Sequence, residues 1–108
     1  MSNTETLQKL AEILEQRKNA QADESYVASL YESGLEKILA KISEEASETV
    51  EAAREKDTDH LIHEVADLWF HCMVLLAQKN ISHEHVLEEL DQRFGISGLV
   101  EKAQRKTK

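Results

Sequence analysis

Two long segments of helical periodicity, separated by a short polar break, constrain the fold of this chain most strongly. Apolar residues recur three or four positions apart through about residues 35–56 and again through about 59–78. Side chains at that spacing share one face of an α-helix. The break, Asp57-Thr58-Asp59, supplies a side chain that can cap the second helix. The pattern therefore predicts a hairpin of two long helices.

The rest of the chain also favours helices. Its 108 residues contain no proline and three glycines, so few positions interrupt a helix. Shorter helices are expected over about residues 5–18, 25–33 and 83–93. In the second of these, Tyr26 and Leu30 are expected only to cover the core. The length fits a single domain over residues 1–108, and the fold class is all-α.

The helix expected over residues 59–78 is apolar around much of its circumference. Its main stripe consists of Leu61, Ile62, Val65, Trp69, Cys72, Met73 and Leu76. Phe70 and Val74 lie opposite that stripe, so the helix needs cover on two sides. A chain of this size has little other protein to provide both covers. We therefore expect a helical bundle completed by dimerisation, with a homodimer as the smallest solution.

Two carboxylate pairs border the apolar stripes of the long helices. Glu45 and Glu48 are three positions apart in the first helix, and Glu64 and Asp67 are three positions apart in the second. Each pair lies on one helix face, so antiparallel packing can bring four carboxylates together. Such carboxylates repel one another unless protons or cations compensate their charge. The oxygen-rich set predicts a site for Mg2+, with Mn2+ as an alternative.

The residues beside these carboxylate pairs can have more than one role. Either pair alone is more often part of a solvated helix surface, and it is the presence of two pairs beside apolar stripes that favours a metal site. Glu44 is an alternate ligand or an orienting group, and Lys41 either contacts phosphate or neutralises the acids. His71, one turn after Asp67, orients that residue, binds substrate or is a hydrogen-bonded structural histidine.

Charge and hydropathy exclude several classes of protein. The formal net charge of −8 argues against a nucleic-acid partner, because phosphate contacts need a basic surface. The longest apolar stretch, residues 68–77, contains His71 and is too short to span a membrane. The chain does not open on a basic region followed by an apolar run, so we expect a cytoplasmic protein. Cys72 is expected in the core, and His83 and His85 on the surface.

The C-terminal segment reverses the charge of the chain. After Gly95-Ile96-Ser97-Gly98, residues 99–108 contain one acid, Glu101, and several cations. These cations are Lys102, Arg105, Lys106 and Lys108. A turn ahead of cations can approach phosphate oxygens through backbone N–H groups and charge-assisted hydrogen bonds. A solvated basic tail explains the same composition.

The motifs Glu44-Glu45-x-x-Glu48 and Glu64-x-x-Asp67 resemble the metal signature of the MazG-like all-α nucleoside triphosphate pyrophosphohydrolases. Further segments resemble the phosphoribosyl-ATP pyrophosphatase family of histidine biosynthesis within that superfamily. They are Arg17-Lys18, Ser25-Tyr26, Gly34, Lys41-Ile42, Ala66-Asp67-Leu68, His71, Arg93-x-Gly95-x-Ser97-Gly98 and Glu101-Lys102. The departures are Val27 in place of a threonine, Phe70 in place of a tyrosine and a first loop without its frequent proline.

The resemblance implies hydrolysis of the α–β phosphoanhydride of phosphoribosyl-ATP to phosphoribosyl-AMP and pyrophosphate, the second step of histidine biosynthesis. Our hypothesis is that Mg2+ is held by Glu45, Glu48, Glu64 and Asp67. Catalysis is assigned to Glu44, Glu45 and Glu48. The residues expected to bind the nucleotide substrate are Arg17, Lys18, Lys41, His71, Arg93, Lys102 and Arg105.

Three alternatives compete with this interpretation. A general nucleoside triphosphate pyrophosphohydrolase would use the same metal chemistry with a different base or sugar pocket. A non-catalytic helical dimerisation module would also explain the apolar helix. A di-iron carboxylate bundle needs Glu-x-x-His pairs, and no glutamate of this chain has a histidine three residues later.

Overall fold

The computed structural model describes residues 3–94, which form five α-helices, two short 3-10 helices and no strand. The helices are α1 (Thr6–Gln16), α2 (Tyr26–Ser33), α3 (Leu35–Arg54), α4 (Thr58–Gln78) and α5 (His83–Asp91), with the 3-10 helices η1 (Asn3–Glu5) and η2 (Arg17–Asn19) on either side of α1. The all-α fold class is confirmed. Every expected helix is present, with ends within two residues of the expected ones.

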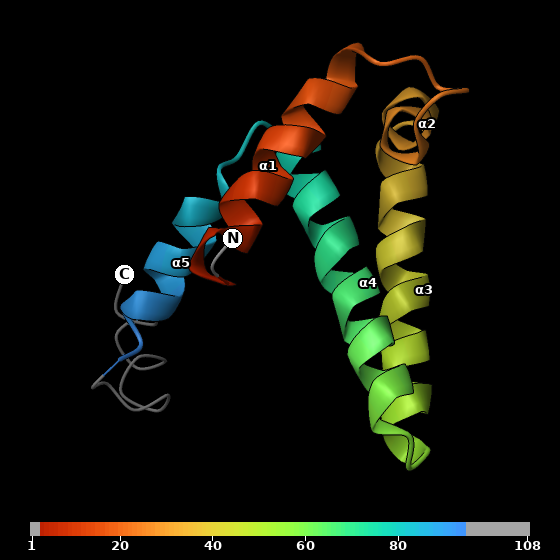
Figure 1. Cartoon of the computed structure of the whole chain (residues 1–108), viewed down its shortest axis with the longest axis vertical. Coiled ribbons are helices and arrows are strands. Elements are labelled where there is room, and N and C mark those ends of the chain that lie inside the picture. The colour runs from red at the N-terminus through yellow and green to blue at the C-terminus, as the bar shows by residue number, and fades with distance from the viewer. Residues whose placement is uncertain (1–2, 95–108) are drawn as a thin grey trace.

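Helices α3 and α4 form the expected antiparallel hairpin and pack side by side along their length (Figure 1). Helix α2 packs at the start of α3, while α1 and α5 contact each other near the C-terminal end of α4. The radius of gyration is 16.3 Å, whereas a compact chain of this size has one of about 13 Å. The chain is therefore an open, V-shaped arrangement rather than a closed bundle (Figure 1).

Local sequence signals fix the ends of the helices. The side chains of Ser25, Asp57 and Ser82 each accept a hydrogen bond from a first-turn backbone N–H of α2, α4 and α5, respectively. Gly34 joins α2 to α3 with φ +96°, a backbone conformation that residues with a Cβ rarely adopt. Asn80 follows α4 with φ +58°, as expected for a residue that ends a helix.

The core lies where the first four α-helices meet. Leu14, Leu30, Ile38 and Val74 are its largest fully buried side chains, one from each of α1 to α4. The Tyr31 hydroxyl donates a hydrogen bond to the Leu14 carbonyl at 2.8 Å and so joins α2 to α1. Val74 ties α4 to this shared core.

Only part of the main apolar stripe of α4 faces inward. Met73 of that stripe joins Val74 in the core cluster with Leu14 of α1 and Ile38 of α3, whereas Ile62 and Trp69 are 61% and 62% exposed. Cys72 is exposed too, so its expected place in the core is wrong. The physical reason is that Trp69 and Cys72 lie on a side of α4 that the other helices of residues 3–94 leave largely uncovered. The expected cover on the second side of α4 stays a prediction, because Ile62 and Trp69 are exposed among the described residues.

The start of α5 also departs from expectation. His83 is 8% exposed because the first turn of α5 packs close to α1 and α4, so its expected surface position is wrong. His85, two residues later, is exposed as expected. Among residues 3–94, none of the helices combines the length and hydropathy that a membrane crossing requires.

Candidate metal centre

Three of the four expected metal ligands meet between α3 and α4. Glu45, Glu48 and Glu64 each offer one carboxylate oxygen that lies within 4.8 Å of the other two. Glu45 and Glu64 are 5% and 7% exposed, respectively, while Glu48 lies at the solvent-exposed edge. The hairpin thus places an i, i+3 pair of α3 opposite a carboxylate of α4, as helical spacing allows.

Two oxygens of this cluster lack a protein partner. Within residues 3–94, Glu45 Oε2 and Glu64 Oε2 are buried and accept no hydrogen bond. A buried carboxylate oxygen without a donor is unfavourable, and a second carboxylate nearby adds repulsion. A divalent cation supplies the missing charge and takes oxygen ligands of this kind. The residues present therefore fit Mg2+ or Mn2+.

Proximity of the carboxylates also changes their titration. A side-chain hydrogen bond to Glu64 raises the pKa of Glu48 from 4.5 to about 7, and desolvation and the negative charge of Glu45 contribute to the shift. A protonated Glu48 can donate to the Glu64 carboxylate, whereas two ionised carboxylates would repel each other. Near neutral pH, a proton and a cation therefore compete for Glu48.

This competition predicts a pH dependence with a definite sign. Because the folded pKa lies above the unfolded value, the metal-free fold loses stability as pH rises from about 4.5 to about 7. Cation binding requires ionised Glu48, so Mn2+ affinity should rise by up to about tenfold per pH unit below 7 and then level off. Titrations of Mn2+ by electron paramagnetic resonance between pH 5.5 and 8.5 will measure the slope. Glu48→Gln should flatten it, and an equal slope in that variant would contradict the prediction.

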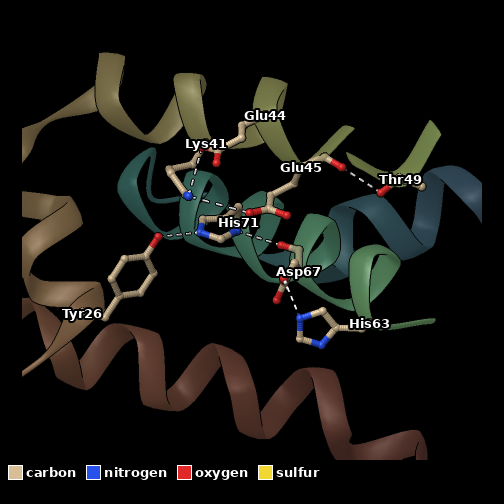
Figure 2. A network of polar contacts seen from close by, with 8 residues as sticks. All are labelled: Tyr26, Lys41, Glu44, Glu45, Thr49, His63, Asp67 and His71. Atoms are coloured by element: carbon tan, nitrogen blue, oxygen red, sulfur yellow. Dashed lines mark hydrogen bonds and ion pairs between the residues drawn. The ribbon is translucent and has the colours of Figure 1, made fainter. Parts of the chain in front are cut away.

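Asp67, the fourth expected ligand, belongs to a second group. One of its carboxylate oxygens, one of Glu64 and a ring nitrogen of His63 all lie within 4.8 Å of one another. His63 Nε2 is 3.3 Å from Asp67 Oδ2 (Figure 2). Sequence reasoning missed His63, although the signal was present: His63 precedes Asp67 by one helical turn and therefore shares its face.

Lys41 and Glu44 form the outer rim of the centre. Lys41 Nζ lies 3.1 Å from Glu44 Oε2 and 3.7 Å from Glu45 Oε1 (Figure 2). The hydrogen bond to Glu44 raises the pKa of Lys41, which stays charged. Lys41 thus neutralises acids here, and its contact with phosphate stays a prediction. Glu44 is exposed and lies in neither group of prospective ligands.

His71 is enclosed between α2 and its own helix. It is 5% exposed, and its Nδ1 donates to the Asp67 backbone carbonyl at 2.8 Å. With its hydrogen on Nδ1, the ring can accept a hydrogen bond from the Tyr26 hydroxyl at Nε2, also at 2.8 Å (Figure 2). Burial raises the pKa of Tyr26, which keeps its hydroxyl protonated as a donor. Of the three roles considered for His71, the contacts favour the structural one, and they give Tyr26 a function beyond covering the core.

The hydrogen bond between Tyr26 and His71 predicts a coupled effect on stability. Tyr26→Phe removes the donor to a buried ring nitrogen, which should lower the free energy of unfolding by about 1 kcal/mol. Urea unfolding followed by circular dichroism will measure the change. In a His71→Leu background the same substitution should have almost no effect, and an equal loss in both backgrounds would rule out the coupling.

Of the expected substrate cations in the first half of the chain, Lys41 lies at the carboxylates, whereas Lys18 lies at the far end of α4. Lys18 Nζ lies 3.0 Å from Glu15 Oε2 and donates to Asn80 Oδ1 at 2.9 Å, just beyond α4. At a rise of 1.5 Å per residue, the end of α4 is about 20 Å along the helix from Glu64. Arg17 precedes Lys18 in η2 and is exposed.

Of the expected cations in the second half of the chain, the structure describes Arg93. Arg93 follows α5, with its Nη2 3.5 Å from Glu89 Oε1. Lys102 and Arg105, with the turn that precedes them, fall outside the described residues. Their roles in substrate binding stay predictions.

An all-helical chain whose central hairpin gathers carboxylates is consistent with the MazG-like all-α class of pyrophosphohydrolases. A family model described as phosphoribosyl-ATP pyrophosphohydrolase matches residues 7–94, and the chain belongs to this family. A protein named phosphoribosyl-ATP pyrophosphatase from Methylococcus capsulatus is 58% identical over 94% of this chain and 97% of its own length. Proteins of the same name from Vesicomyosocius okutanii and Ruthia magnifica are 55% and 54% identical, over 94% and 90% of this chain and 96% and 92% of their own lengths.

Proposed function

We propose that this chain is a phosphoribosyl-ATP pyrophosphatase, which releases pyrophosphate from phosphoribosyl-ATP and leaves phosphoribosyl-AMP. This reaction is the second step of histidine biosynthesis. The observation that carries the proposal is the meeting of Glu45, Glu48 and Glu64 in a chain whose relatives of that name match it over nearly its full length.

We further propose that the activity depends on Mg2+, held by Glu45, Glu48 and Glu64. When bound there, Mg2+ neutralises phosphate oxygens and makes a coordinated water more acidic. Glu45 and Glu64 anchor the centre from inside the hairpin, and Glu48 stands at the edge where substrate and water arrive. Asp67 contributes through the group that it shares with Glu64. Since Glu44 faces outward and pairs with Lys41, its proposed role is to orient Lys41 rather than to bind the metal.

The oligomer we propose is a homodimer. The large apolar side chains left exposed on α4 and α5, or just beyond them, are Ile62, Trp69, Ile81, Val86, Leu87, Leu90 and Phe94. A groove of about 420 Å³ runs between Trp69, Leu76 and α5. Exposed apolar patches often mark protein–protein interfaces, and a second copy would also close the open arrangement of the chain. We keep the expectation of a cytoplasmic enzyme.

The decisive assay measures pyrophosphate release by purified protein, with and without Mg2+, on phosphoribosyl-ATP beside a panel of ordinary nucleoside triphosphates. Selective, Mg2+-dependent turnover of phosphoribosyl-ATP is the expected result. Comparable turnover of the whole panel would instead identify a general nucleoside triphosphate pyrophosphohydrolase. Absence of turnover on every substrate would favour the non-catalytic dimerisation module.

A further inference from the structure

A cavity of about 320 Å³ is bounded by α1, the end of α4 and the start of α5. Met73 and Ala77 form its α4 wall. At a rise of 1.5 Å per residue, they are about 14 and 20 Å along the helix from Glu64. No prospective metal ligand found among residues 3–94 lines the cavity. It is therefore a separate site, and its volume suits a small ligand.

His83 is a buried polar side chain of this cavity. It is 8% exposed, and its ring forms no hydrogen bond or ion pair with the other described residues. Burial of a polar group without a partner is unfavourable. A neutral imidazole has one nitrogen that donates and one that accepts. A molecule in the cavity that offers a hydrogen bond would therefore stabilise the ring.

The charge of the walls determines which kind of molecule fits. Glu15 of α1 and Glu84 of α5 both line the cavity, and no lysine or arginine in the described part of the chain does. Glu15 is paired with Lys18 at 3.0 Å, whereas Glu84 forms no ion pair within residues 3–94. Leu14 and Met73 add apolar surface. The walls thus favour a ligand with a positive charge and an apolar body.

We propose that this cavity binds a small organic ammonium ion, an aliphatic amine or diamine. Its hydrocarbon chain would lie on Leu14 and Met73, and its ammonium group at Glu84. An ammonium group has three donors and no acceptor, so it can donate to the Glu84 carboxylate and to the His83 ring at once. The contact with Glu84 is a charge-assisted hydrogen bond, one of the stronger kinds. The bound ion would join α1 to α5 at the end of α4.

The test is a titration of the full chain with 1,4-diaminobutane, followed by the His83 ring signals in the NMR spectrum and by thermal unfolding. Salt at about 0.15 M screens unspecific attraction to this acidic chain. We expect a saturable shift of the ring signals with one ligand per chain, and a raised melting temperature. Two matched ligands serve as controls, 1,4-butanediol without charge and succinate with the opposite charge. Neither should shift the ring signals.

Variants of two exposed acids of α5 test the position of the ammonium group. Glu84→Gln should lower the affinity for 1,4-diaminobutane at least tenfold. Glu88→Gln is the matched control, because Glu88 lies one turn later in α5 and outside the cavity. It should bind as the parent does. Both side chains are exposed, so neither change should unfold the chain.

Three results would overturn the proposal. They are equal affinity in Glu84→Gln and the parent, an equal response to 1,4-butanediol, and no saturable response to the diamine, as expected of a cavity that holds only water. Binding that depends on Glu84 in a protein inactive on every nucleotide would uphold this site and refute the proposed function.

Discussion

Glu64→Gln should lower Mg2+-dependent pyrophosphate release by at least about 100-fold, or ~2.7 kcal/mol of activation free energy, without destabilising the metal-free fold. Glu64 is common to both prospective ligand groups, so its charge serves a metal ion bound by either group. The amide has nearly the same size and shape as the carboxylate. It removes a buried negative charge close to Glu45 and Glu48, which relieves repulsion when no cation is bound.

Two measurements separate the loss of function from a loss of fold. Turnover on phosphoribosyl-ATP gives the first, and thermal unfolding with and without Mg2+ gives the second. The parent should gain stability on adding Mg2+, because a ligand of the folded state alone raises its melting temperature, and Glu64→Gln should not. Glu36→Gln, which makes the same change at an exposed position of α3, should behave as the parent. Turnover within tenfold of the parent would show that Glu64 is not a metal ligand.

Local signals in the sequence were sufficient to predict the helices and their ends. The spacing of apolar residues gave the five helices, and the capping side chains of Asp57 and Ser82 lie where expected. These features depend on contacts within a few residues of one another. The i, i+3 spacing of Glu45 and Glu48, opposite Glu64, likewise predicted most of the carboxylate cluster.

Features that depend on packing between helices could not be predicted in this way. Cys72 and Val74 are both apolar residues of α4, and only the positions of α1 and α3 decide that Val74 is buried and Cys72 exposed. The separation of Asp67 from the cluster depends on the rotation of α4 about its axis. His63 was not predicted as a neighbour of the Asp67 carboxylate, because one histidine a helical turn before an acid is a common pattern on a helix surface. Only the structure shows that its ring is turned toward Asp67.

Trp69→Glu should convert the proposed homodimer to a monomer. Trp69 is 62% exposed on α4 and lines the groove formed with α5. Large aromatic side chains at the centre of an interface often dominate its binding energy. Burying an unpaired carboxylate in their place is strongly unfavourable. We expect the dissociation constant of the dimer to rise by at least about 100-fold, or ~2.7 kcal/mol.

Sedimentation velocity over a range of protein concentrations will measure the oligomeric state. Trp69→Phe is the matched control, because it keeps an apolar ring at the same position and should keep the dimer. Circular dichroism should show the same helix content in both variants, since Trp69 is absent from the core cluster of this chain. A dimer with an unchanged dissociation constant in Trp69→Glu would show that the exposed face of α4 is not the dimer interface. A different partner would then have to cover the apolar side chains of that face.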